Sequence, residues 1–354
     1  MTKRAAIILS GGKSKRFQSE KKTWQDKALV EFFGKPLLIH AVENVQGFVE
    51  EIVIIVNDAN RKARYSKVLK AYHIKNVRLL IDEKIDNLGG PLVAILTGLK
   101  SVEADYCLTL PCDMPMLQPR VIEYMFNIAK DSCVVVPMWP NGRLETLIMV
   151  LERKCTLKIA NILCQLKRPR SDDIIRGVLN VLFISTVGEL AALDPELKSF
   201  ININHREDLA QLQPRRAQGP VTENTRLNLA SLPTFEIQRL QDGVSACKES
   251  RFSEATRIFA SCATRLEKEE LFFWAAISRE NEGKSLLEQT QREKEQESSA
   301  GHASRGKKAL LKAAANYELE AEMHEKNGYV FLAGRSRSDK SWCESHVGTL
   351  FGQK

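Results

Sequence analysis

Between residues 4 and 212, short apolar runs alternate with longer amphipathic stretches. The runs are four to nine residues long and rich in β-branched side chains, and several are apolar throughout, as in strands that are covered on both faces. We expect strands at residues 4–10, 51–57, 77–82, 105–113, 133–137, 144–152 and 179–185, and helices at 36–48, 60–72, 91–102 and 119–130. This alternation predicts an α/β fold with a doubly wound, mostly parallel sheet, which binds ligands at the carboxyl ends of its strands.

The pattern changes after residue 212. Residues 213–225 are polar, contain proline and glycine and have no periodicity, so we assign 213–232 as a linker. From residue 233 the β-branched runs disappear, and Ala, Leu, Glu, Lys and Arg dominate in a helical pattern. We therefore expect one domain at 1–212 and a smaller all-α domain at 233–354, with a polar break at about 288–308.

The second domain has a signature of helical hairpins. In residues 243–262, small and bulky side chains fall where tetratricopeptide repeats place their packing residues, namely Gly243, Phe252, Ala255, Phe259 and Cys262. A weaker echo lies in residues 311–342. We expect a small array of about four to six helices that resembles these repeats. A generic amphipathic bundle is the alternative.

Charge and cysteine content restrict the partners and the compartment. The chain has 52 Lys and Arg against 44 Asp and Glu, a net charge of +8 that favours anionic partners. Its basic runs lack interleaved aromatic residues or a recognisable nucleic-acid module, so we do not expect a nucleic-acid partner. The eight cysteines are widely spaced, which is typical of reduced core thiols.

Membrane insertion and secretion are not expected either. No uncharged apolar run approaches the roughly 18 residues that a spanning helix needs. The apolar stretch near the N-terminus, residues 5–9, is too short for a signal peptide. We expect a cytoplasmic protein.

The first predicted strand ends in the sequence LSGGKSKRF. Gly11 and Gly12 allow backbone N–H groups to approach phosphates, and positive charge follows at Lys13, Lys15 and Arg16. The string is neither a Walker A loop nor GxGxxG. It predicts a phosphate-binding loop, with an ordinary strand-to-helix turn as the alternative.

Further polar residues lie near or follow the predicted strands. Lys27 follows the loop, and Asn57 and Asp82 each end a strand. Asp113 comes just past the hydrophobic part of another strand and is flanked by two prolines. Asp113 is a candidate Mg²⁺ ligand, because Mg²⁺ takes one or two carboxylates together with phosphate oxygens. Each residue alone could be a turn, a cap or an exposed side chain. Their occurrence together, in this order, favours a nucleotide site.

At this point the sequence resembles the MobA-type nucleotidyltransferases, the molybdenum cofactor guanylyltransferases. The matching strings are LSGGKSKRF, DKALVEFFGKPLL, GGPLVAIL, PCDMP and FININHREDL, within residues 4–212. The resemblance implies a Rossmann-like enzyme that transfers GMP from GTP to the phosphate of molybdopterin and releases pyrophosphate, with Mg²⁺ as cofactor.

The resemblance also implies roles for individual residues. Lys27 and Asp113 would be catalytic, with Asp113 binding Mg²⁺. The nucleotide would be bound by Leu9, Ser10, Gly11, Gly12, Lys13, Arg16, Lys27, Asn57 and Asp82. Asn202 and Asn204 would border the acceptor. Two departures are Ser10, where the family usually has Ala, and His205, where it usually has Thr.

Two other functions remain open from the sequence. One is a nucleotidyltransferase of the same fold that uses CTP or another nucleotide, or a different phosphorylated acceptor. The other is a nucleotide-sensing scaffold whose C-terminal helices hold a protein partner.

Overall fold

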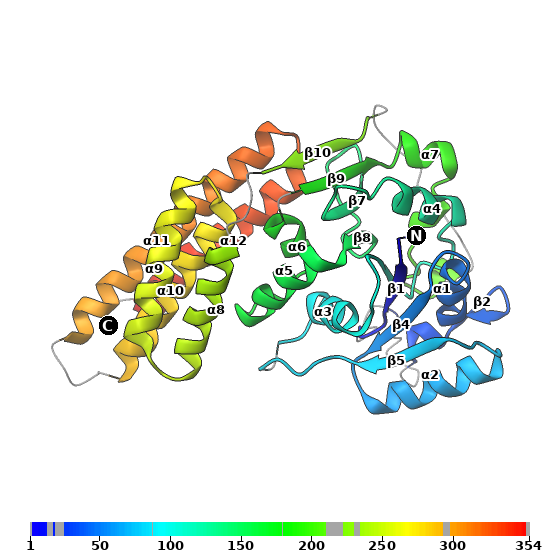
Figure 1. The fold of residues 1–354 in the computed structure, drawn as a ribbon, viewed down its shortest axis with the longest axis horizontal. Helices are drawn as coiled ribbons and strands as arrows, with labels where there is room; N and C mark the ends of the chain where they lie inside the picture. Colours follow the sequence, from blue (N-terminus) through cyan, green and yellow to red (C-terminus); the bar gives the residue numbers. More distant parts are fainter. Residues whose placement is uncertain are drawn as a thin grey trace. The chain divides into compact units, whose positions relative to one another are not determined.

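A computed structural model describes residues 2–12, 17, 25–86, 88–178, 180–209, 222–229, 234–292 and 298–351. Contacts between residues divide the chain into two compact units (Figure 1). The first comprises Met1–Cys164 and Arg168–Asn228, and the second comprises Gln165–Lys167 and Leu229–Lys354.

The first unit is built on an eight-stranded sheet with the order β10-β9-β7-β8-β6-β1-β4-β5. β1 lies between β4 and β6 and is parallel to both, while β4 is parallel to β5 and β7 to β9. β8 and β10 are antiparallel to their neighbours. The strands are β1 Arg4–Leu9, β4 Glu51–Val56, β5 Val77–Ile81, β6 Tyr106–Pro111, β7 Val134–Met138, β8 Met149–Glu152, β9 Asn180–Ser185 and β10 Thr225–Asn228. The predicted mostly parallel α/β sheet is therefore confirmed.

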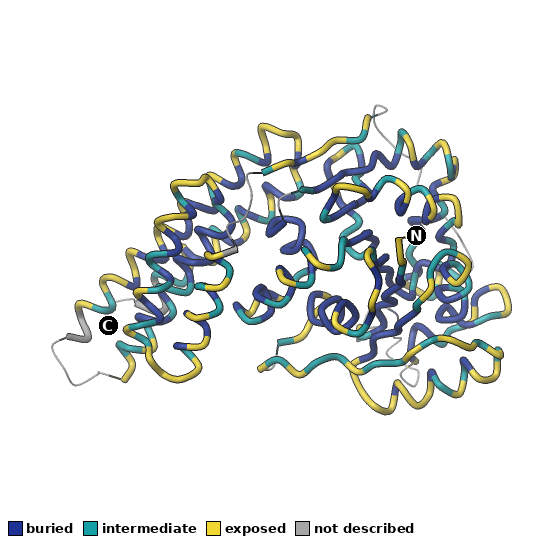
Figure 2. Tube along the Cα trace, in the orientation of Figure 1, coloured by how far each residue is buried: buried dark blue, intermediate teal, exposed yellow. Residues whose placement is uncertain are grey.

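Helices cover both faces of this sheet, and the alternation of side chains along β1 separates the two faces. Ala6 and Ile8 pack into a core with apolar residues of α1, α2 and α4, whereas Ile7 faces Gly98 of α3. The central strands of the sheet are buried along most of their length (Figure 2). The predicted helices correspond to α1 Leu37–Val45, α2 Ala59–Ala71, α3 Pro91–Ser101 and α4 Pro119–Asn127. The prediction missed α5 Arg153–Gln165, α6 Asp172–Gly177 and α7 Glu189–Leu193, as well as the hairpin of β2 Glu31–Phe32 and β3 Lys35–Pro36.

β10 lies within the segment 213–232 that we expected to be linker. It pairs with β9 as the edge of the sheet, and its Leu227 is buried. Before it, Asn224 donates to Tyr124 Oη at 3.1 Å and accepts from Ser185 N at 2.9 Å. The sequence did not reveal this strand because Leu227 is the one apolar residue among its four. Residues 213–221 and 230–232 of the expected linker lie outside the described residues.

The second unit contains five helices in its described part, within the expected range. They are α8 Thr234–Lys248, α9 Phe252–Lys268, α10 Phe272–Arg292, α11 Ser298–Lys326 and α12 Val330–Phe351, and each packs on the next along the chain. A Cβ atom on Gly243 would lie 2.8 Å from the ring of Phe259, so this glycine allows α8 to approach α9 closely. Most of the expected polar break at 288–308 is helical, and residues 293–297 are not among the residues that the structure describes. The resemblance to tetratricopeptide repeats stays a prediction.

None of the described helices combines the length and the apolar character that crossing a bilayer requires.

Candidate active site

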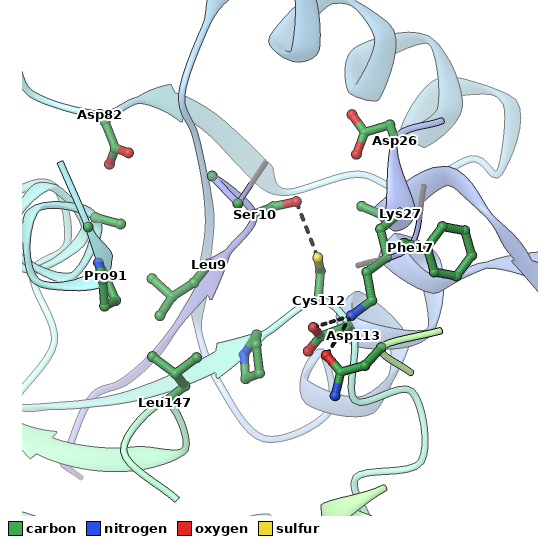
Figure 3. A pocket seen from close by; sticks show the side chains of 17 residues that line it. Leu9, Ser10, Phe17, Asp26, Lys27, Asp82, Pro91, Cys112, Asp113 and Leu147 are labelled. Atoms are coloured by element: carbon green, nitrogen blue, oxygen red, sulfur yellow. Dashed lines mark hydrogen bonds and ion pairs between the residues drawn. The ribbon is translucent and has the colours of Figure 1, made fainter. Parts of the chain in front are cut away.

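A cavity of about 530 Å³ opens at the carboxyl ends of β1, β5 and β6 (Figure 3). Most of the residues proposed from the sequence line it, namely Leu9, Ser10, Gly11, Gly12, Lys27, Asp82, Asp113 and Asn204. Asn57 and Asn202 are not among the described residues that line the cavity. Lys13, Lys15 and Arg16 lie outside the described part of the chain.

The glycine loop leaves the sheet directly after β1. Ser10 N still donates to Ile55 O of β4, at 2.9 Å, so the backbone departs only after Ser10. A Cβ atom on Gly11 would lie 3.3 Å from Asp82 Oδ2, tighter than most such contacts. The absence of a side chain at residue 11 therefore lets the loop lie against the Asp82 carboxylate.

Lys27 and Asp113 form an ion pair at the edge of the cavity. Lys27 Nζ lies 2.7 Å from Asp113 Oδ2 and donates to Asn204 Oδ1 at 3.3 Å. Ile203 N donates to the backbone oxygen of Asp113 at 2.9 Å, so the segment that carries Asn204 is fixed beside this pair. Asp113 Oδ1 is buried and has no hydrogen-bond partner among the described residues. The pair thus offers a buried cation and a carboxylate oxygen that is available to a ligand.

Asp82 lies at the other end of the cavity, after β5 (Figure 3). Burial raises the pKa of this carboxyl group to about 6. Its Oδ1 atom is buried and has no hydrogen-bond partner in the part of the chain that the structure describes. The side chain is therefore an unsatisfied acceptor that a bound ligand can satisfy.

The wall of the cavity between these two ends is largely apolar. Leu9, Pro91, Ala94, Pro111 and Leu147 contribute to it. A largely apolar wall with a few polar groups is typical of a site for a small molecule or cofactor.

The start of α3 borders the same cavity, and its geometry requires glycine. Gly90 has φ +121°, and a Cβ atom there would lie 2.6 Å from the carbonyl oxygen of Pro169. That oxygen accepts a hydrogen bond from Leu92 N at 3.3 Å. Residues 168–170 thus fix the turn into α3, a role that sequence analysis missed.

The segment that fixes this turn is itself held by a buried carboxylate. Asp173 is fully buried and accepts hydrogen bonds from Arg168, Arg170 and Arg176. Burial acts to raise the pKa of Asp173, but these three guanidinium groups outweigh it and hold the pKa below its usual value. We interpret this cluster as structural support for the loop at Gly90.

A second group that sequence analysis missed surrounds Asp26, the residue before Lys27. Asp26 is buried, and its carboxylate accepts from Arg61 Nε at 2.9 Å, Arg64 Nη2 at 3.0 Å and Tyr65 Oη at 3.2 Å. Arg61 also donates to Asn57 Oδ1 at 3.0 Å, which gives Asn57 a supporting position beside the loop. The sequence carried no signal for this group, because α2 is a largely polar helix that reads as exposed.

Ser10, one of the departures from the family pattern, joins the same group. Its hydroxyl lies 2.7 Å from Tyr65 Oη and donates to Cys112 Sγ at 3.3 Å. Burial raises the pKa of the Cys112 thiol to about 12 and that of the Tyr65 hydroxyl well above its usual value. Both groups therefore stay protonated and serve as neutral hydrogen-bonding partners in this core.

Comparison with known proteins relates the first unit to nucleotidyltransferases. Residues 6–179 match the family described as MobA-like NTP transferase domain. The probable molybdenum cofactor guanylyltransferase of Methanosarcina acetivorans is 30% identical over 210 residues, which are 59% of this chain and 89% of that protein. The corresponding protein of Pyrococcus horikoshii is 31% identical over 211 residues, 58% of this chain and 96% of its own.

Among solved structures, one similar chain is molybdopterin-guanine dinucleotide biosynthesis protein A from Archaeoglobus fulgidus. It is 20% identical, has a TM-score of 0.47, and the similarity covers 58% of this chain and 95% of that one.

Proposed function

This chain belongs to the MobA-like nucleotidyltransferases, and we propose that it transfers GMP from GTP to the phosphate of a molybdopterin-type acceptor, releasing pyrophosphate. The observation that carries the proposal is the ion pair of Lys27 and Asp113 at 2.7 Å beside the glycine loop, with Asp113 Oδ1 left for a ligand. The names of the relatives, molybdenum cofactor guanylyltransferases, support this class of acceptor.

Asp82 supports guanine as the base. The ring N–H and the amino group of guanine are adjacent donors, and an ionised carboxylate can accept from both. Cytosine offers an amino donor beside an acceptor nitrogen, so it would satisfy one oxygen of Asp82 and face the other with a lone pair. The orphaned Asp82 Oδ1 at one end of the cavity therefore favours GTP over CTP.

The residues at the other end fit Mg²⁺. Asp113 supplies a carboxylate oxygen without a partner among the described residues, and Mg²⁺ prefers oxygen ligands, with nucleotide phosphates completing its shell. When bound, the ion would neutralise charge on the phosphates and on the departing pyrophosphate.

The chain's own residues then have to bring two anions together. An oxygen of the acceptor phosphate attacks the α-phosphorus in line, the bond to the bridging oxygen breaks, and pyrophosphate leaves with its electron pair. Lys27 offsets the negative charge that accumulates, and the backbone of Gly11 and Gly12 orients the phosphates. Asn204, which accepts from Lys27 Nζ, and the neighbouring Asn202 would border the acceptor.

Product identification tests this function. The purified chain is incubated with each of the four nucleoside triphosphates and Mg²⁺, either with molybdopterin or with another phosphorylated acceptor such as a sugar phosphate, and the products are analysed by mass spectrometry. We expect pyrophosphate and a GMP adduct of the acceptor with GTP. A CMP adduct, or an adduct only with another phosphorylated acceptor, would contradict the proposed substrates but not the nucleotidyl transfer.

For the helical unit we propose a tetratricopeptide-like array that holds a protein partner. The close packing of Gly243 on Phe259 supports the repeat-like hairpin of α8 and α9. Binding of a candidate partner protein would be measured with the full chain and with the isolated residues 229–354. Equal affinities would mean that the helical unit alone binds the partner, and no binding to the full chain would contradict the proposal.

A further inference from the structure

Arg61 is almost completely buried although it belongs to a polar helix. It is 3% exposed, and its guanidinium reaches several separate segments of the chain. Nε donates to Asp26 Oδ2 at 2.9 Å, while Nη1 donates to Ser10 O at 3.0 Å, to Gly12 O at 3.2 Å and to Asn57 Oδ1 at 3.0 Å. A buried charge is costly unless it is fully paired, so this set of contacts specifies one arrangement of the loop.

The contact with Ser10 O determines the direction of the next N–H group. In a planar trans peptide the N–H points away from the C=O. Because the Ser10 carbonyl accepts from Arg61, the N–H of Gly11 is directed to the opposite side, and Gly11 lines the cavity. A fixed backbone N–H at this place is a ready donor to a phosphate oxygen.

Through Asp26, Arg61 also fixes the segment that carries Lys27. Asp26 precedes Lys27 and is held by Arg61 and by Tyr65 Oη. The same tyrosine hydroxyl lies 2.7 Å from Ser10 Oγ, so the loop and the Asp26–Lys27 segment share one buried network. This network connects the loop to the segment that carries Lys27, whereas Lys27 Nζ itself is held by Asp113 and Asn204.

We propose that Arg61 is a positioning residue for the phosphates of the bound nucleotide. It holds the loop at Ser10–Gly12 and the segment at Asp26–Lys27 so that Gly11 N–H and Lys27 Nζ act on the same triphosphate. The inference rests on the proposed transfer from a nucleoside triphosphate.

The substitution Arg61→Lys tests this role with Arg64→Lys as the matched control. Lysine keeps the charge but not the planar fork that spans several acceptors. Arg64 donates to the same Asp26 oxygen, but its side chain is 44% exposed. We expect Arg61→Lys to raise the KM for GTP by about 10- to 100-fold and to leave the KM for the acceptor nearly unchanged. Arg64→Lys should change both by less than about twofold.

A merely structural role has a different signature. It would lower the melting temperature and the active fraction, and hence kcat, while the KM for GTP stayed as in the wild type. That result in folded Arg61→Lys protein would overturn the inference. If the lysine variant does not fold, Tyr65→Phe, which removes one link between Ser10 and Asp26, should still raise the KM for GTP, and an unchanged KM would overturn it too.

Chemical rescue adds a second readout. Millimolar guanidinium should restore GTP binding to Arg61→Ala, whereas sodium chloride at equal ionic strength should not; the absence of any difference would count against the role. If the wild type shows no transfer, the proposed function fails. Calorimetric affinities for GTP of the wild type and Arg61→Lys then decide the inference separately, with equal affinities overturning it.

Discussion

Lys27 and Asp113 are 86 positions apart in the chain, and the fold brings their side chains to 2.7 Å. Both side chains are largely buried, so the ion pair is little screened by solvent. Asp113 keeps one oxygen free of partners among the described residues. At the scale of residues, the candidate site therefore combines a buried ion pair with a carboxylate oxygen that is available to a ligand.

The substitution Lys27→Ala should lower kcat by about two orders of magnitude or more, because it removes a preorganised cation from the transition state. Steady-state pyrophosphate release would measure this. Lys35→Ala is the control, because Lys35 pairs with Glu43 on the surface and is 43% exposed. An unchanged rate in folded Lys27→Ala protein would remove this lysine from the site.

Asp82 predicts a pH dependence. Its pKa is about 6, so the carboxylate that can accept from guanine becomes populated as the pH rises through 6. We expect GTP affinity to increase by up to about tenfold per pH unit below this value and to level off above it. The stability of the free protein should change in the opposite direction. A pKa that is raised in the folded state contributes stability that is lost as the pH rises through about 6.

Calorimetric titration with GTP from pH 5 to 8 and melting curves of the free protein would test both signs. Asp82→Asn is the control for both experiments, since an amide does not titrate and should flatten both curves. GTP affinity that does not change across this range in the wild type would place the base elsewhere.

At the scale of elements, the site depends on how α3 packs on β1. A Cβ atom on Gly98 would lie 2.4 Å from Cγ2 of Ile7, which is fully buried. The glycine thus sets the distance between this helix and the strand that ends in the glycine loop. α3 in turn begins at Gly90 and Pro91, at the edge of the cavity.

Gly98→Ala should destabilise the protein by about 1–3 kcal/mol through overpacking, although alanine favours the helix by about 1 kcal/mol. Urea denaturation would measure the change. Gly47→Ala is the control, because a Cβ atom at this position would meet no neighbouring atom within 4 Å, so the free energy of unfolding should change little. Adding Ile7→Ala to Gly98→Ala should relieve the clash, so the double variant should lose less stability than the sum of the losses in the two single variants. Strictly additive losses would contradict this explanation of the packing.

The elements show what the sequence could and could not predict. Strands such as β1 and β4 are nearly continuous apolar runs, and helices α3 and α4 begin with proline, so both kinds were predictable. Asp82 and Asp113 were recognisable because they follow such strands. β10 was not, because its stability comes from pairing with β9 and from the single buried Leu227.

Arg61 and Asp26 were not predictable for a similar reason. Nothing local distinguishes Arg61 from the other basic residues of α2, and its burial arises only when the loop, Asp26 and Asn57 come together in the fold. The supporting contacts of a site depend on tertiary structure, whereas candidate ligand-binding residues such as Asp82 and Asp113 follow strands of the sheet, which is a recurrent position for ligand sites.

At the scale of the whole molecule, the chain joins a nucleotidyltransferase unit to a helical unit. The first ends after β10, at Asn228, rather than at residue 212. The structure therefore predicts that a fragment of residues 1–229 is more stable than one of residues 1–212. The longer fragment keeps β10 and the contacts of Asn224 and Arg226 with Tyr124 and Ser132.

We expect the fragment 1–229 to melt about 4–12 °C above the fragment 1–212, which corresponds to about 2–3 kcal/mol for a unit of this size. Differential scanning calorimetry of the two fragments would measure this. The substitution Leu227→Ser in the longer fragment should reproduce part of the loss. Equal melting temperatures would mean that β10 contributes nothing to the unit.

We propose above all that the cavity performs Mg²⁺-dependent nucleotidyl transfer through Asp113. The most direct measurement is Mg²⁺-dependent pyrophosphate release from GTP and molybdopterin by the wild type and by Asp113→Asn, which keeps the size of the side chain and removes its charge. We predict release by the wild type and a loss of at least about 100-fold in the variant, with its fold intact. Release by folded Asp113→Asn protein at a rate close to that of the wild type would contradict the account.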